Sequence, residues 1–291
     1  MRRHLSAILL LLVLTGCCLA QRTVQDELGR KVVVANSPHR IVSLAPSITD
    51  TIYAIGAGAD IVGVSNYTKY PPEATKKPSV GEPLNPSIET IIALHPDLVL
   101  AIEDMNRLET VEQLEKAGIP VFVVHPHDLA GIYASITDLG TALNRPKEAA
   151  GLVSRLHGRE QAVRDHVKGA PAPQVFFVLW PDPVMTVGKH AFITELIEIA
   201  GAKSVTDDMS DNWPQISAEA LLVRKPDFLL LVRGSQLTID DLKKKPGWNS
   251  LEAVRANHVF YTDDRVLHPS PAAFDALEDL ANQFHPLGQH R

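Results

Sequence analysis

Polar and aromatic side chains gather at the points where predicted buried strands end. They are Tyr67, Tyr70, Glu103, His125, His127, Trp180, Trp213, Arg233, Arg265 and His268. Loops at the carboxyl ends of parallel strands are where such sheets bind ligands. Aromatic residues make up only 5% of the chain, so several of them at strand ends indicate a large ligand with flat faces.

The histidines among these residues raise the question of metal chemistry. His125 and His127 flank a proline without a carboxylate cluster nearby in the sequence, which is weak support for a metal site. We therefore expect no dedicated metal site and no resident cofactor. His268 could ligate the metal centre of a ligand, although a lone histidine in a loop is more often a solvated polar group.

A metal-dependent hydrolase is the enzyme class that this composition could support. Glu103, Asp104, Asp263 and Asp264 lie at strand ends and could join the histidines in such a site. The sequence contains no His-x-x-Glu-His motif, no Gly-x-Ser-x-Gly motif and no phosphate-binding loop. We expect that the protein is not an enzyme, and an exported hydrolase remains the least favoured alternative.

The elements that position these loops occur twice, 130 residues apart. Residues 87–100 and 217–230 share Ser, Glu, Pro, Asp and a final Leu at matching positions. Each copy predicts a Ser at a helix start, a short apolar helix, a Pro-Asp break and a buried strand. The wider pattern alternates strands with helices. It predicts an α/β fold with two similar lobes, each a mainly parallel sheet flanked by helices, joined by a long interdomain helix.

Each repeat places one acidic residue, Glu89 or Glu219, in the first turn of its helix. The helix dipole favours a carboxylate there, and a first-turn Glu usually faces water. Matched charges on two lobes indicate a partner that is itself two-fold symmetric. The alternative is that both glutamates only cap their helices.

The amino terminus indicates export. Arg2 and Arg3 precede an apolar run over residues 5–14, which is too short to span a bilayer, since that needs about 20 residues. The run ends in Leu-Thr-Gly-Cys, which looks like a bacterial lipobox with cleavage before Cys17 and lipidation of its thiol. Ordinary signal cleavage near Ala20 is the alternative. The only cysteines are Cys17 and Cys18, so we expect no disulfide in the folded part.

The remaining boundaries follow from composition and periodicity. We predict a signal peptide over 1–16, a tether with an extended segment over 17–38, an N-terminal lobe over 39–127, a connecting helix over 128–169 and a C-terminal lobe over 170–291. The connecting segment reads as one helix, or as two joined near residues 144–146, because a proline disfavours helix at the residue before it. A helical connector predicts small relative motion of the lobes. The net charge of −6 without a basic cluster argues against nucleic acid as a partner.

Several of these segments together resemble one family. Residues 40–47, 63–72 and 85–99 in the first lobe, with 186–189, 213–217 and 270–271 in the second, are similar to the helical-backbone class of substrate-binding proteins. These serve ABC importers for cobalamin, ferric siderophores and haem, and the cobalamin binders are the most similar. The resemblance implies a ligand held between the lobes, and Glu89 and Glu219 docked onto arginine pockets of two permease subunits.

The strand-end loops and the resemblance together predict a ligand-binding set, which comprises Tyr67, Tyr70, Trp180, Met185, Trp213 and His268. Tyr67 and Trp213 match the family's ligand-stacking positions. The chain departs from cobalamin binders at residues 81–84, where they carry a tryptophan, at Met185, where they carry an aromatic residue, and at His268, where they carry an arginine. We expect a lipid-anchored protein of the periplasm or cell envelope that delivers cobalamin or a related corrinoid. A ferric siderophore or haem, as another large metal chelate, is the alternative ligand.

Overall fold

The computed structural model describes residues 20–233 and 237–286. The predicted signal peptide over 1–16 and the lipidation site Cys17 lie outside these residues. None of the described helices is long and apolar enough to cross a membrane.

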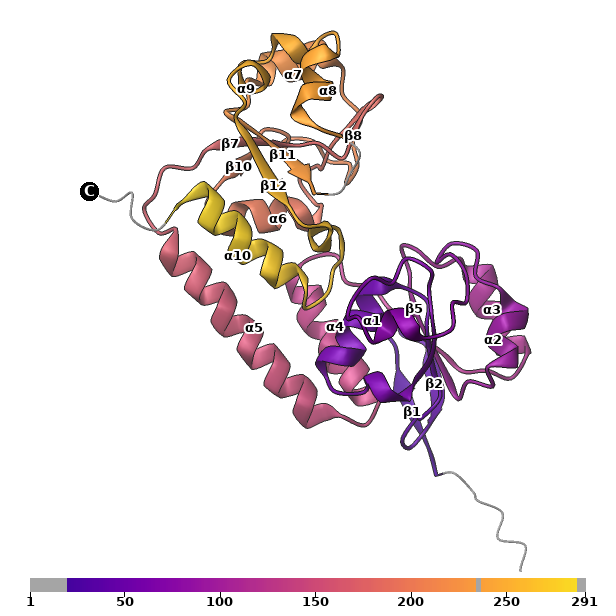
Figure 1. The fold of residues 1–291 in the computed structure, drawn as a ribbon. Helices are drawn as coiled ribbons and strands as arrows, with labels where there is room; N and C mark the ends of the chain where they lie inside the picture. Colours follow the sequence, from indigo (N-terminus) through magenta and orange to yellow (C-terminus); the bar gives the residue numbers. More distant parts are fainter. Residues whose placement is uncertain (1–19, 234–236, 287–291) are drawn as a thin grey trace, which may run out of the picture.

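The chain folds into two lobes on either side of a helical connector (Figure 1). The N-terminal lobe contains a parallel sheet in the order β4-β3-β5-β6. Its strands and helices are β3 (Ile41–Ser43), α1 (Pro46–Ala54), η1 (Gly58–Asp60), β4 (Ile61–Val64), η2 (Ala74–Lys76), α2 (Ile88–Ala93), β5 (Leu98–Ile102), α3 (Leu108–Lys116) and β6 (Val121–Val124). Residues of all four strands are fully buried, as expected of a parallel sheet covered on both faces.

The C-terminal lobe repeats this topology. Its parallel sheet has the order β10-β7-β11-β12, so first, second, third and fourth strands occupy equivalent places in both sheets. Its first elements are β7 (Gln174–Phe177), the small antiparallel pair β8 (Trp180–Pro181) and β9 (Val184–Met185), α6 (Phe192–Ile199) and β10 (Lys203–Ser204). They are followed by α7 (Ala218–Arg224), β11 (Phe228–Val232), α8 (Ile239–Lys244), η3 (Trp248–Ser250), α9 (Glu252–Arg255), β12 (Val259–Thr262), η4 (Asp264–Leu267) and α10 (Ala273–Phe284).

The 130-residue repeat is visible in the backbone as well as in the topology. Ser87 and Ser217 are N-caps whose side chains accept the amides of the third residues of α2 and α7. His95 and Lys225, also 130 residues apart, both adopt positive φ, at 46° and 47°. Each is followed by a Pro-Asp pair whose aspartate accepts the backbone N–H at the start of the lobe's first strand. The repeated residues therefore form a repeated joint between helix and strand.

The sequence predicts a tether with one extended segment over residues 17–38, but within this range the chain forms an antiparallel hairpin of β1 (Gln21–Gln25) and β2 (Lys31–Ala35). Val24, Val32 and Val34 point inward at alternating positions, which anchors the hairpin to the N-terminal lobe. The extended segment that the sequence predicts is one arm of this hairpin.

The connecting segment forms two helices, α4 (Leu129–Ala142) and α5 (Pro146–His166). The break lies at Asn144, which has a φ of 57°, and Pro146 begins α5. Of the two arrangements open from the sequence, the single uninterrupted helix is wrong, because a left-handed residue and a proline end the first helix. α5 has 21 residues and is therefore about 30 Å long, and it runs along the side of both lobes (Figure 1).

The connector is bound to the C-terminal lobe through α10. Arg159 of α5 donates hydrogen bonds to Asp275 and Glu278 of α10 at 2.6 Å each. Glu195 of α6 accepts the backbone N–H of Leu129 at the start of α4. These contacts make the long helix part of the lobe and not a free linker.

Candidate functional site

A cleft of about 630 Å³ lies between the lobes. It is lined by residues that follow β3, β4 and β5 in one lobe and β7, β11 and β12 in the other, because the carboxyl ends of both sheets face it. Its lining residues are Pro46, Tyr67, Lys69, Met105, Val178, Leu179, Trp180, Pro181, Val232, Arg233, Leu237, Asp241, Asp264, Leu267 and His268. Most of these side chains are apolar, which suits a large ligand with extensive apolar surface.

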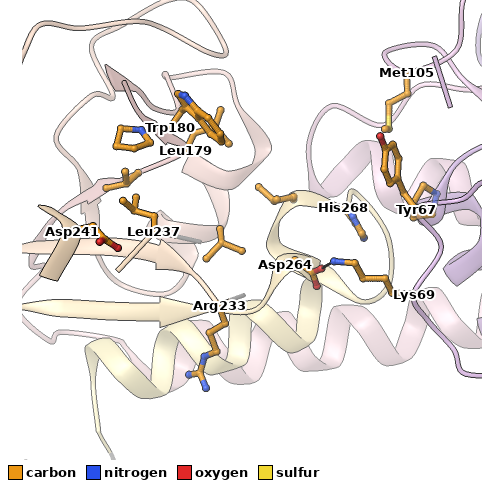
Figure 2. A pocket seen from close by; sticks show the side chains of 15 residues that line it. Tyr67, Lys69, Met105, Leu179, Trp180, Arg233, Leu237, Asp241, Asp264 and His268 are labelled. Atoms are coloured by element: carbon orange, nitrogen blue, oxygen red, sulfur yellow. Dashed lines mark hydrogen bonds and ion pairs between the residues drawn. The ribbon is translucent and has the colours of Figure 1, made fainter. Parts of the chain in front are cut away.

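Two aromatic side chains stand on opposite walls of the cleft. Figure 2 shows Trp180 on the C-terminal side and Tyr67 on the N-terminal side, with the open space between them. Their exposed fractions are 58% and 51%, so each ring offers a face to solvent. The indole Nε1–H of Trp180 donates to the backbone oxygen of Asp182 at 2.9 Å, which orients the ring within the β8–β9 hairpin. Aromatic walls of this kind can hold a flat ligand at low conformational entropy cost.

The floor of the cleft carries an ion pair that joins the two lobes. Lys69 Nζ of the N-terminal lobe lies 2.6 Å from Asp264 Oδ2 of the C-terminal lobe (Figure 2). The hydrogen bond with Asp264 raises the pKa of Lys69. Because the lysine side chain is 63% exposed, water screens the pair and it contributes little to stability. Its position matters more, since it ties the two walls together below the ligand space.

A second contact between the lobes lies beside the floor. Ser270 donates its hydroxyl hydrogen to Asp50 Oδ2 of α1 at 3.2 Å. Burial raises the pKa of Asp50 to about 7, although Ser270 and Arg265 favour its charged form. The junction between the lobes therefore contains a carboxyl group that titrates near neutral pH.

His268 lines the cleft and has one ring nitrogen without a hydrogen-bond partner among the described residues. This atom, Nδ1, is buried. Burial lowers the pKa of this imidazole, which favours the neutral form at neutral pH. A neutral imidazole at this place could accept a hydrogen bond from a ligand or coordinate the metal of a chelate.

The six predicted ligand-binding residues separate into two groups. Tyr67, Trp180 and His268 line the cleft, whereas Tyr70, Met185 and Trp213 are outside its described lining. Tyr70 lies under the guanidinium of Arg265, with 5.9 Å from Cζ to the ring centroid.

Met185 and Trp213 belong to the C-terminal wall rather than to its inner surface. Met185 pairs with Trp180 across the β8–β9 hairpin and bridges to Gln215. Trp213, in the turn before Gln215, is 47% exposed. Met185 is therefore part of the hairpin that carries Trp180, and Trp213 lies in the segment that precedes its bridge partner Gln215.

The two matched glutamates are exposed in the first turns of α2 and α7. These helices lie on the sides of their lobes away from α5 (Figure 1). Hydrogen bonds from its own backbone N–H and from Ser217 lower the pKa of Glu219. Ser87 donates to Glu89 Oε2 at 3.4 Å. Each glutamate thus has a local partner and also presents its charge to solvent.

The acidic residues of the hydrolase hypothesis lie in different environments. Asp263 and Asp264 pair with Arg265 and Lys69 in the C-terminal lobe and at the cleft floor. Asp104 lies near His125 and His127 at the end of the N-terminal sheet.

Sequence reasoning missed Lys69, Met105 and Leu237 as lining residues. Lysines and aliphatic residues in loops are common, and only the packing of the two lobes brings these three to one cavity.

Three comparisons with known proteins agree with this architecture. A family model described as periplasmic binding protein matches residues 41–266. An uncharacterised ABC transporter substrate-binding lipoprotein of Bacillus subtilis is 32% identical over 272 residues, covering 91% of this chain and 85% of the relative. A vitamin B12-binding protein of Yersinia pestis is 30% identical over 208 residues, covering 72% of this chain and 74% of the relative.

A solved structure has the same arrangement of lobes. The periplasmic haem-binding protein of Roseiflexus sp. RS-1, in its apo form, superposes with a TM-score of 0.78 and 29% identity. The match covers 85% of this chain and 98% of that protein.

Proposed function

This chain belongs to the periplasmic binding protein family, whose members are exported substrate-binding proteins of ABC importers, and we propose that its ligand is cobalamin or a related corrinoid. The observation that carries this proposal is the apolar cleft with Tyr67 and Trp180 on opposing walls. A corrin ring is large and flat, and aromatic faces on both sides bury its surface. The similarity to a vitamin B12-binding protein over 72% of the chain supports the same ligand class.

The cleft performs binding and release, not bond chemistry. Its ligand is cargo, so the walls must exclude water from two broad faces while leaving an edge open to the permease. The polar groups near the floor, Lys69, Asp264 and His268, are placed to meet the polar periphery or the central metal of the cargo. Family members and relatives are binding proteins of transporters, which agrees with a role in ligand binding and release.

Haem is the second candidate, and the imidazole of His268 in the cleft lining favours it. Its buried Nδ1 has no hydrogen-bond partner among the described residues, and burial lowers the pKa of the ring, which favours the neutral form. A neutral imidazole is a common axial ligand of haem iron. The similarity to a haem-binding protein of Roseiflexus supports the same possibility.

Attachment and delivery complete the proposal. A lipid on Cys17 would hold the protein at the membrane, and a lipoprotein relative of Bacillus subtilis supports this anchor. Glu89 and Glu219 would dock the lobes onto two like permease subunits, since both carboxylates are exposed and carry the same local geometry.

The ligand is tested by titrating the purified protein with cyanocobalamin and, separately, with haemin. We expect tryptophan fluorescence to be quenched at one equivalent of corrinoid, because Trp180 lines the cleft. Trp180→Phe should remove most of the quenching and keep the binding seen by calorimetry. Trp213→Phe is the matched control, since Trp213 is exposed to a similar degree but lies outside the cleft lining.

Each outcome of the two titrations assigns the ligand or rejects the proposal. The ligand is haem and not a corrinoid if haemin binds saturably, cyanocobalamin does not bind, and His268→Ala abolishes the shift of the haem absorption band. If neither cyanocobalamin nor haemin binds saturably, the proposal that the cleft holds a flat tetrapyrrole-like ligand is wrong.

A further inference from the structure

Four titratable side chains meet at the carboxyl end of the N-terminal sheet, next to the cleft. Glu103 and Asp104 follow β5, and His125 and His127 follow β6. Because β5 and β6 are neighbouring parallel strands, their ends lie side by side. Asp104, His125 and His127 each offer one ligand atom, and these atoms lie within 4.8 Å of one another. The two histidines have no carboxylate cluster near them in the sequence. In the structure Asp104, which follows the adjacent strand β5, lies beside them.

The two imidazoles point toward one another and toward Asp104. The Nε2 atoms of His125 and His127 face each other in direct contact. Asp104 Oδ2 lies 3.8 Å from Nδ1 of His127. Two imidazoles and a carboxylate that converge in this way can share one cation after small side-chain rotations.

Glu103 supplies the outer partner that a metal-binding histidine requires. Its carboxylate contacts Nδ1 of His125, although the contact lacks hydrogen-bond geometry in this rotamer. A carboxylate beside Nδ1 keeps the imidazole proton on that atom and leaves the Nε2 lone pair for a metal. A rotation of Glu103 that completes this hydrogen bond would select the tautomer that the site needs.

The backbone around the cluster is held in place by neighbouring elements. Glu27 of the β1–β2 turn accepts the backbone N–H of His125. The backbone N–H of Glu103 donates to Val124 at 3.0 Å, and the Asn106 side chain accepts the N–H of Ile102 at 2.7 Å. Both loops are thus fixed before any ion binds, which lowers the ordering cost of a metal site.

We propose that Asp104, His125 and His127, with Glu103 as the positioning residue, bind a divalent first-row transition cation such as Zn²⁺. Imidazole nitrogen suits this class of ion, whereas Ca²⁺ and Mg²⁺ take oxygen ligands. The side chains of Asp104 and His127 are 62% and 49% exposed, so the ion keeps an open position toward solvent. None of these four residues lines the described part of the cleft, while the next residue, Met105, does. The site is therefore separate from the ligand space and adjacent to it.

The test is calorimetric titration of untagged, EDTA-treated and dialysed full-length protein with Zn²⁺. We expect one equivalent to bind, and we expect His127→Ala and Asp104→Asn each to weaken binding at least tenfold. Glu103→Gln should weaken it about 10- to 100-fold, the range measured for outer-sphere partners of metal ligands. Co²⁺ in place of Zn²⁺ should give visible absorption bands that His127→Ala removes.

His190→Ala is the matched control, because His190 is an exposed histidine of the other lobe. It should leave Zn²⁺ affinity unchanged, and all variants should keep the apo melting temperature, since the mutated side chains are solvent-accessible. Absence of stoichiometric Zn²⁺ binding, or equal affinity in the wild type and His127→Ala, would overturn the metal site. Corrinoid titration in EDTA reports on the cleft independently, so failure of one proposal is distinguishable from failure of the other.

Discussion

Replacing Asp50 by Asn should stabilise the protein at alkaline pH and leave it unchanged at acid pH. Asp50 lies between the lobes, where its Oδ2 accepts the hydroxyl hydrogen of Ser270. Burial raises its pKa from an ordinary value of 3.8 to about 7. Asparagine keeps a side-chain acceptor of similar shape for Ser270 but cannot ionise.

The expected gain follows from proton linkage. The folded state binds the Asp50 proton more tightly than the unfolded state, so stability falls as pH rises between about 4 and 7. The pKa of Asp50 rises by about three units, and each unit corresponds to about 1.36 kcal/mol. Ionisation of Asp50 can therefore lower the free energy of unfolding by at most about 4 kcal/mol above neutral pH. Partial solvation of the group reduces this figure, and we expect Asp50→Asn to be more stable by about 2–4 kcal/mol at about pH 8.5. Below about pH 4 both states of the wild type are protonated at this position and the difference should vanish.

Urea unfolding followed by circular dichroism at several pH values measures the difference directly. Asp165→Asn, a change at an exposed carboxylate of α5, provides the control and should leave the pH profile unaltered. If Asp50→Asn were equal to the wild type, or less stable, at about pH 8.5, the assignment of a buried protonated carboxyl to the lobe junction would be refuted.

Four further variants test the anchor, the docking surface and the cleft. Cys17→Ala should give uncleaved or soluble protein, and normal partitioning of the variant into detergent would contradict the lipobox. The double change Glu89→Arg and Glu219→Arg should nearly abolish uptake in vesicles that contain the permease, while ligand affinity in solution stays intact, because charged rim contacts mainly set encounter rate and register. Near-normal uptake, together with a lower melting temperature, would instead mark both glutamates as helix caps. Tyr67→Ala and Trp180→Ala should each weaken ligand binding by about 1–3 kcal/mol with little change in apo melting temperature, and unchanged affinity by calorimetry would exclude that residue from the site.

The sequence predicted those features that depend on local signals. Ser87 and Ser217 act as N-caps, as the serine at each helix start indicated. The break in the connector falls at the Asn-Arg-Pro stretch, where the chain chemistry opposes a helix. The two parallel sheets follow from buried apolar runs that alternate with helical periods, and the resemblance placed the ligand space between them.

The features that the sequence did not predict depend on contacts between distant residues. Lys69 and Asp264 are 195 residues apart, and Asp50 and Ser270 are 220 apart. No local sequence pattern distinguishes these side chains from other surface polar residues, because each one contacts its partner only after the two lobes have packed together. The same is true of Asp104 beside His127, which requires the adjacency of β5 and β6.

The connecting helix α5 has a consequence for binding kinetics. Its hydrogen bonds to α10 and the lobe contacts of Lys69 and Asp50 lead us to expect that the two cleft walls keep a set separation. A ligand then enters a gap whose width already exists, so association requires no slow closing step. The observed association rate should rise linearly with ligand concentration and reach no plateau. Ligands whose thickness does not match the gap should have higher dissociation rates.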